Sequence, residues 1–190
     1  MGTKRLFIAV DLPLEVRKTL HELGSGVLKK CDSARPVKTN NMHITLKFLG
    51  DVPSDDMNLL NTAISGGILS FKSFTFEIDG KIDAFPDKKR ARTLFTGIGE
   101  GKQELQLLYL SIGESLERVC DQFNTRACRK DYIAHITLAR FSYPEDISEA
   151  IDEARTIIPF RISVRNITLF ESILGPGGAR YTKLKEFSLK

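Results

Sequence analysis

The sequence predicts a mixed fold of strands and helices in which two similar lobes are related by an approximate two-fold axis. Strand-like alternation and helical periodicity follow one another along the chain. One segment also occurs twice, because residues 43–46 and 135–138 both read His-Ile-Thr-Leu, and each copy continues through a proline-containing turn into acidic residues. The copies begin 92 residues apart (135 minus 43) in a chain of 190, close to half its length. A duplicated architecture follows from this spacing.

Length and composition predict one globular unit. The chain has 42% hydrophobic and 27% charged residues, which is ordinary for a globular protein, and we expect residues 1–190 to form a single bilobal domain. No apolar run reaches the roughly 18 residues that a membrane-spanning helix needs. The first apolar stretch ends at Asp11, too early for the core of a secretory signal. We therefore expect a cytoplasmic protein with no membrane partner.

The net charge and the cysteine pattern give limited information about binding partners and metal sites. The formal net charge is +4, which is compatible with an anionic partner such as RNA but too small to establish one. The three cysteines, Cys31, Cys120 and Cys128, are odd in number and lack CxxC spacing. They therefore predict neither a disulfide framework nor a zinc site.

The first half of the chain is expected to contain two strands and two helices. Pro13 ends a first strand over Leu6–Leu12, and it suits the first position of a helix that runs to Lys30. Residues 31–41 are polar and read as a loop. A β-branched, apolar strand then covers Met42–Leu49. Ser54 caps a second helix, which is expected to end at the glycines 66 and 67.

The second half is expected to begin with a half-buried strand, because Phe74, Phe76 and Ile78 alternate with polar residues. Leucines at helical spacing indicate a long amphipathic helix after the glycines at 99 and 101. In order, the expected elements are strands over Phe71–Ile78 and Arg92–Ile98, a helix over Lys102–Asn124, a strand over Tyr132–Phe141, a helix over Pro144–Arg155, and a closing hairpin of Phe160–Glu171 with Arg180–Leu189.

The repeated tetrapeptide contains two of the three histidines. In a strand, histidine and threonine at positions i and i+2 share one face, and the isoleucine and leucine share the other. One copy alone would indicate only a strand with a polar face. Two copies in equivalent halves would bring two imidazoles and two hydroxyls to one central groove, from His43, Thr45, His135 and Thr137.

Two imidazoles on opposite sides of a groove suit acid–base cleavage of a phosphoester. A neutral imidazole takes a proton from the attacking water, and a protonated one gives a proton to the leaving oxygen. The threonine hydroxyls can donate hydrogen bonds to the non-bridging phosphate oxygens. The near symmetry of the two motifs leaves open which histidine is the acid and which is the base.

The motifs resemble those of the RNA 2′,3′-cyclic phosphodiesterases, also called 2′-5′ RNA ligases, within the two-histidine phosphoesterase superfamily. The resemblance covers nearly the whole chain. This sequence departs from the family pattern at Ala91, where proline is common, and at Phe95, where tryptophan is common. The matching segments are the opening strand 5–13, the first signature 42–52, the middle hairpin at 84–86 and 92–97, and the second signature 135–140.

The resemblance implies an α+β, bilobal, duplicated fold in which two antiparallel β-sheets face a central groove with helices outside. It also implies opening of an RNA 2′,3′-cyclic phosphate to a 2′-phosphate without metal or other cofactor. On this pattern His43 is the proton donor and His135 the proton acceptor, and Thr45 and Thr137 bind the phosphate. The expected partner is an RNA or oligonucleotide with a cyclic phosphate end, the reverse reaction is 2′-5′ RNA ligation, and we expect a monomer.

Four further residues are candidates for substrate binding. Lys47 shares a strand face with Thr45 by strict alternation, where it would either contact phosphate or be solvated. Arg92 lies just beyond the basic run 88–90 and is the residue of that group most suited to the groove, because it lies in the strand that matches the family.

Phe48 and Arg140 each follow a motif histidine by five residues. Strict alternation puts both on the wrong face, but a bulge near the strand end would re-aim them. Both side chains are planar, so they could stack on a base, and Arg140 could also contact phosphate.

Two other classes of protein compete with this interpretation. A catalytic zinc site usually has three protein ligands, and only two histidines converge here. A non-catalytic module could bind a nucleotide or RNA end in the same groove, although the presence of both histidines favours an enzyme. His21 has no companion motif and is expected to be a surface or packing residue.

Overall fold

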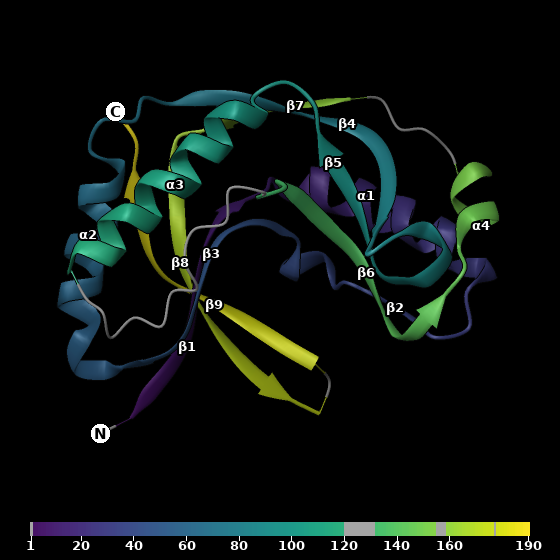
Figure 1. Cartoon of the computed structure of the whole chain (residues 1–190), viewed down its shortest axis with the longest axis horizontal. Helices are drawn as coiled ribbons and strands as arrows, with labels where there is room; N and C mark the ends of the chain where they lie inside the picture. Colours follow the sequence, from purple (N-terminus) through teal and green to yellow (C-terminus); the bar gives the residue numbers. More distant parts are fainter. Residues whose placement is uncertain (1, 120–131, 155–158, 177) are drawn as a thin grey trace.

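The computed structural model describes residues 2–119, 132–154, 159–176 and 178–190 (Figure 1). Their strands form one curled sheet in the order β7-β4-β5-β6-β3-β1-β8-β9, with the short β2 paired to β6. The strands are β1 (Thr3–Asp11), β2 (Ala34–Pro36), β3 (His43–Pro53), β4 (Phe74–Phe85), β5 (Ala91–Ile98), β6 (His135–Glu145), β7 (Phe160–Val164), β8 (Asn166–Gly175) and β9 (Gly178–Ser188).

The sheet divides into two antiparallel halves. One half contains β3, β1, β8 and β9, and the other contains β6, β5, β4 and β7. The strands β3 and β6 join the halves through one backbone pair, between Ile44 and Ile136. The expected α+β bilobal fold class is therefore confirmed, and its two sheets are connected edge to edge at the two motif strands.

The helices cover the halves crosswise. They are α1 (Leu14–Val27), α2 (Met57–Ile68), α3 (Lys102–Val119) and α4 (Ser148–Asp152), with single 3-10 turns at Leu28–Lys30, Thr39–Asn41, Ser54–Asp56 and Lys88–Arg90. The helix α1 follows β1 but packs against β6 of the other half, and α3 follows β5 but packs against β3 (Figure 1). Among the described residues, no helix has the length and apolar character needed to cross a membrane.

The main hydrophobic core lies between the helices and one face of the sheet. Ile44 and Leu46 of β3 and Ile136 and Leu138 of β6 are almost completely buried in it. Since side chains alternate across a strand, the histidines and threonines between them lie on the opposite face. A small second cluster of Phe7, Ala9 and Phe170, with Tyr181 packed against it, covers that opposite face in the first half.

Several expected element boundaries differ from the structure. Residues 31–41 are not all loop, because Ala34–Pro36 adds an edge strand to β6. Pro144 lies within β6 and does not start a helix, and α4 begins at Ser148. The expected strand 160–171 is two strands that separate at Arg165, of which β7 pairs with β4 and β8 with β1 and β9.

The glycines 66 and 67 do not end the second helix. The helix continues to Ile68. The lack of a side chain at Gly67 allows close packing against α3, where an added Cβ would lie 2.9 Å from the Cα of Ile112. The expected ends of the two later helices, at Asn124 and Arg155, lie outside the described residues, as do Cys120 and Cys128.

Candidate active site

The two motif strands contain the same β-bulge at the same place. In β3, Thr45 pairs with Ala9 and Lys47 pairs with Ile8, so Leu46 is the extra residue. In β6, Thr137 pairs with Phe95 and Ala139 pairs with Leu94, so Leu138 is the extra residue. A bulge of one residue moves the side chains that follow it to the other face of the strand, as far as the next irregularity, which in β3 is at Leu49. The duplication therefore extends from the sequence to the irregularities of the backbone.

His43 is held by hydrogen bonds at both ring nitrogens. Its Nδ1 lies 2.7 Å from the backbone oxygen of Asn41, and its Nε2 lies 3.0 Å from the hydroxyl oxygen of Thr45. A carbonyl can only accept, so Nδ1 carries a hydrogen and Nε2 of the neutral ring accepts from Thr45. The rings of Phe7 and Tyr181 contact the imidazole at centroid distances of 4.9 and 5.4 Å.

His135 is held in the same tautomer. Its Nδ1 donates to the backbone oxygen of Ile133 at 2.8 Å, and Ile133 precedes it by two residues, as Asn41 precedes His43. Phe85 and Phe95 contact the ring edge to face, at 5.1 and 5.4 Å. The half-buried Thr137 occupies the position equivalent to Thr45. Each imidazole therefore directs its Nε2 lone pair away from the backbone and is able to exchange a proton there.

Burial and nearby charge keep both imidazoles neutral at pH 7. Burial lowers the pKa of His43 to about 4, and it also lowers the pKa of His135 from its ordinary value. The guanidinium of Arg140 lowers the pKa of both rings further, so this cation acts on both histidines. A ring that serves as the acid must therefore become protonated when an anion binds, because the negative charge raises the pKa of the ring.

One carboxylate breaks the symmetry between the two halves. Asp11 pairs with His43 in the β1–β3 ladder, whereas Gly97 occupies the equivalent place opposite His135. The negative charge of Asp11 raises the pKa of His43, against the larger effect of burial. Asp11 itself is ion-paired with Lys183 at 2.7 Å and with Arg17 at 3.5 Å.

The structure places Phe48 on the histidine side of the sheet. Its ring stacks on Phe7 at a centroid distance of 5.8 Å and an angle of 13°, and Phe7 contacts His43. The side chain is 51% exposed, which is unusual for phenylalanine. Arg140 is also exposed, at the equivalent position of β6. The bulges responsible lie at Leu46 and Leu138, before the strand ends where a bulge was expected.

Because of the same bulge, Lys47 lies on the core side of the sheet. Its predicted position on the histidine face is therefore wrong. Lys47 is only 4% exposed, and its Nζ lies 5.6 Å from the centroid of the Tyr109 ring of α3. Tyr109 stacks on Tyr132, whose hydroxyl donates to the backbone oxygen of Thr45 at 2.8 Å. Burial raises the pKa of the Tyr132 hydroxyl, which therefore remains a donor. Lys47 and these two tyrosines thus support the bulge from the core side.

Arg92 is exposed at the start of β5, where the pairing with β6 shifts between Ala91 and Thr93. It is not among the residues whose contacts or charges act on either imidazole. The structure therefore brings His43, Thr45, His135, Thr137, Phe48 and Arg140 to one face of the sheet and gives no support for including Arg92.

Sequence reasoning missed the surroundings of the two rings. The carbonyl groups of residues 41 and 133 orient both imidazoles, but a backbone oxygen has no sequence signature. The aromatic residues around the rings had a detectable signal, because Leu6, Phe7 and Ile8 form a continuous apolar run, which is typical of a strand covered on both faces. Among the described residues, no three His, Cys, Asp or Glu side chains cluster as they would around a metal ion.

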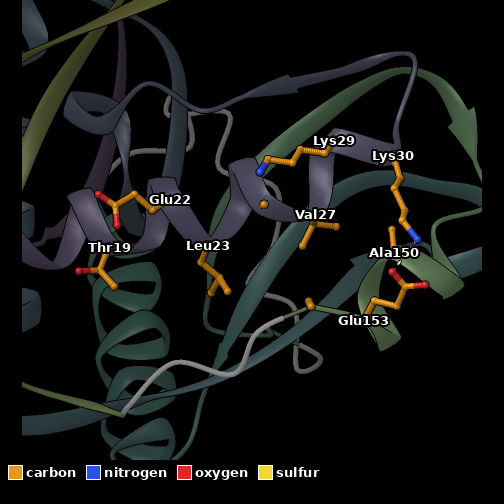
Figure 2. A pocket seen from close by; sticks show the side chains of 10 residues that line it. Thr19, Glu22, Leu23, Val27, Lys29, Lys30, Ala150 and Glu153 are labelled. Carbon is orange, nitrogen blue, oxygen red and sulfur yellow. Dashed lines mark hydrogen bonds and ion pairs between the residues drawn. The ribbon is translucent and has the colours of Figure 1, made fainter.

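A cavity of about 550 Å³ between α1 and α4 is separate from this site (Figure 2). An ion pair between Lys30 and Glu153 lies at its edge, and Glu22 adds a second carboxylate. None of the motif residues line it. Its position on the helix side of the second half excludes it as the place where the two histidines act.

Comparisons with known proteins agree with this geometry. The family model described as LigT like Phosphoesterase matches residues 10–95 and 104–181. The RNA 2′,3′-cyclic phosphodiesterase of Thermotoga maritima is 29% identical over 182 residues, covering 96% of this chain and 94% of the relative. The enzyme of the same name from Escherichia coli K12 is 30% identical over 187 residues, covering 98% and 97%.

Solved structures share the fold over almost the whole chain. The crystal structure of E. coli LigT with 3′-AMP has a TM-score of 0.73 and 30% identity, covering 99% of each chain. The same protein with phosphate has a TM-score of 0.71 and 28% identity, covering 100% of this chain and 99% of the other.

Proposed function

This chain belongs to the LigT-like phosphoesterase family, and we propose that it opens the 2′,3′-cyclic phosphate at the 3′ end of an RNA to leave a 2′-phosphate. The family confirms the resemblance drawn from the two motifs, and the relatives from T. maritima and E. coli are named as phosphodiesterases, which gives the reaction class. The observation that supports the proposal is that the two bulged His-x-Thr strands pair with each other and hold both imidazoles in the same tautomer.

In the proposed reaction, Nε2 of His135 takes a proton from a water molecule as the water oxygen attacks phosphorus. The bond between phosphorus and the 3′ oxygen breaks on the opposite side, and His43 gives its proton to that oxygen. The product has a free 3′ hydroxyl and a 2′-phosphate. Thr45 and Thr137 donate hydrogen bonds to the non-bridging oxygens, where negative charge develops in the transition state.

The two histidines must begin the reaction in different protonation states. His43 must be protonated, although its pKa is about 4 in the unliganded protein. The negative charge of the substrate phosphate favours the imidazolium, and Asp11 supplies a second negative charge beside this ring alone. His135 faces Gly97 and remains the neutral ring that accepts a proton. Asp11 thus supports the assignment of His43 as the acid.

The proposal is tested with an oligoribonucleotide that ends in a 2′,3′-cyclic phosphate, in the presence of excess chelator. We expect turnover to a 2′-phosphate. His43→Ala and His135→Ala should each reduce kcat by about 10²- to 10⁴-fold, the usual effect of removing a general acid or base. Thr45→Ala should also lower kcat, because it removes a hydrogen-bond donor to the phosphate. Thr62→Ala, which changes an exposed threonine of α2, is its matched control. Full activity of either histidine variant, or inhibition by chelator that zinc or manganese reverses, would contradict the mechanism.

A substrate whose 3′ oxygen is replaced by sulfur separates the acid from the base. A thiolate leaves without a proton, so this substrate no longer needs the general acid. We expect it to restore most of the activity of His43→Ala and little of that of His135→Ala. The opposite pattern would exchange the two roles.

2′-5′ ligation uses the same step, with the 5′ hydroxyl of a second RNA in the place of water. It is detected as a 2′-5′ linkage when an RNA with a 5′ hydroxyl is added in excess. The competing function, binding of an RNA end without reaction, would be supported if the wild-type protein bound the cyclic-phosphate oligonucleotide and left it unchanged.

A further inference from the structure

A second cavity, also of about 550 Å³, adjoins the candidate active site on the His43 side. It lies between the 3-10 turn Thr39–Asn41 and the start of β9. Its lining contains three side chains that are or can become cationic and three with amide or hydroxyl groups, and it contains no carboxylate. The lining residues are His21, Lys38, Thr39, Asn40, Asn41, Gly178, Ala179 and Arg180.

Two connections join this cavity to the imidazole of His43. The backbone oxygen of Asn41 accepts from Nδ1 of His43, while the side-chain amide of Asn41 donates to the backbone oxygen of Ala179 at 2.7 Å. Tyr181, which follows Arg180 on β9, contacts the imidazole with its ring. The cavity therefore begins directly behind the ring that we propose as the acid.

The geometry of the reaction determines where the rest of the RNA must lie. Water attacks phosphorus on the side opposite the leaving 3′ oxygen, and that oxygen belongs to the terminal ribose. The ribose, and every nucleotide before it, is therefore on the side of the group that protonates the leaving oxygen. If His43 is the acid, the RNA chain leaves the site on the His43 side, toward this cavity.

We propose that this cavity binds the phosphate that joins the terminal nucleotide to the one before it, and so makes an oligonucleotide a better substrate than a single nucleotide. This inference rests on the proposed function. Lys38 and Arg180, both exposed at the cavity, provide the positive charge, and Thr39 and Asn40 provide hydrogen-bond donors. The cavity between α1 and α4 suits a phosphate less well, because the carboxylates of Glu22 and Glu153 oppose the charges of Lys29 and Lys30 in its lining (Figure 2).

The test compares kcat/KM for three substrates: a nucleoside 2′,3′-cyclic phosphate, the same compound with a 5′-phosphate, and a short oligonucleotide ending in the cyclic phosphate. In the wild type we expect the added 5′-phosphate to raise kcat/KM. In Lys38→Ala/Arg180→Ala, the ratio of kcat/KM for the oligonucleotide to that for the nucleoside compound should fall about tenfold, mainly through KM. The oligonucleotide reaction should also become less sensitive to salt, because fewer counterions are released.

Lys72→Ala/Arg165→Ala removes the same two charges from exposed positions outside the cavity and is the matched control. Thermal unfolding by circular dichroism verifies that both double variants are folded. An unchanged ratio in Lys38→Ala/Arg180→Ala, or an equal fall in the control, would overturn the subsite while leaving the proposed function intact. Failure of the wild type to turn over any of the three substrates would overturn both.

Discussion

Backbone carbonyl groups, and not carboxylates, orient both histidines. Asn41 and Ile133 accept from Nδ1 at 2.7 and 2.8 Å, so each ring has a fixed tautomer without a neighbouring negative charge at that nitrogen. A carboxylate in the same place would favour the imidazolium in the absence of substrate. With carbonyls, both rings remain neutral without substrate, and in the proposed mechanism the charge of the bound phosphate, together with Asp11 beside His43, favours protonation of His43.

Phe48 lies on the histidine side of the sheet, as expected for a side chain that a bulge has re-aimed. It is half exposed next to a ring that contacts His43, where a base adjoining the phosphate can stack on it. We predict that Phe48→Ala weakens nucleotide binding by about 1–3 kcal/mol and to a similar degree for each base, because every base has a stacking face. The value of kcat should change much less. Calorimetric titration with the four 3′-nucleotides measures the effect.

Leu107→Ala is the control for this substitution, because Leu107 is 58% exposed on α3, away from the site. A loss of affinity no larger than that of the control, or one confined to a single base, would contradict a stacking role for Phe48.

The contrast between Lys47 and Phe48 shows the limit of prediction at single positions. The identity of the motif histidines and threonines was predictable, because the repeat marks them. The face on which Lys47 lies was predicted wrongly, because alternation assumes a regular strand and the bulge at Leu46 reverses the faces. Phe48 was placed on the histidine side only by assuming a bulge. No residue type in 43–48 marks a bulge, so the phase of the strand after Thr45 required the structure.

The helices α2 and α3 pack closely against each other. Ser111 and Ser115 of α3 donate to the backbone oxygens of Gly67 and Ala63 at 2.7 Å each. The two helices approach closely because Gly67 has no side chain. The sequence suggested instead that the glycines end a helix, since glycine is common at that position. Only the presence of α3 against this face distinguishes the two uses.

We predict that Gly67→Ala lowers the free energy of unfolding by about 1–3 kcal/mol. Its Cβ would lie 2.9 Å from the Cα of Ile112 and 3.1 Å from the backbone oxygen of Ser111, and backbone atoms cannot move aside cheaply. Gly66→Ala is the matched control, because its Cβ would meet only the hydroxyl of Ser115 at 3.2 Å, and alanine favours a helix. Urea unfolding of both variants measures the difference, and equal stabilities would contradict the packing argument.

The whole molecule is interlocked by its crossing helices. Because α1 and α3 each cover the half of the sheet opposite to the strand they follow, neither half has a complete core alone. The main hydrophobic cluster contains residues of both halves. We therefore propose that the chain forms one bilobal domain. The two lobes were predictable from the repeat. The exchange of β7 and β8 between them was not, since both read as one continuous strand.

Burial of the histidines also makes the stability of the whole molecule depend on pH. His43 has a pKa of about 4 in the folded protein and an ordinary value of 6.5 when unfolded. Between these values the unfolded chain binds more protons, so the free energy of unfolding falls as the pH falls from about 6.5 toward 4. The difference between the two pKa values corresponds to a loss of at most about 3 kcal/mol in the free energy of unfolding. His135 acts in the same direction.

A phosphate bound between the two histidines should reverse this dependence. Because its charge favours the imidazolium, binding takes up a proton, and affinity for inorganic phosphate or a 3′-nucleotide should rise as the pH falls from 7.5 to 5.5. Urea unfolding at pH 7.5, 5.5 and 4.5, with and without ligand, measures both effects. In His43→Gln the stability without ligand should fall less with acidity, and the ligand should stabilise less at pH 5.5. If the wild type and this variant lose stability in parallel between pH 7.5 and 4.5, burial of His43 is not the source of the pH dependence.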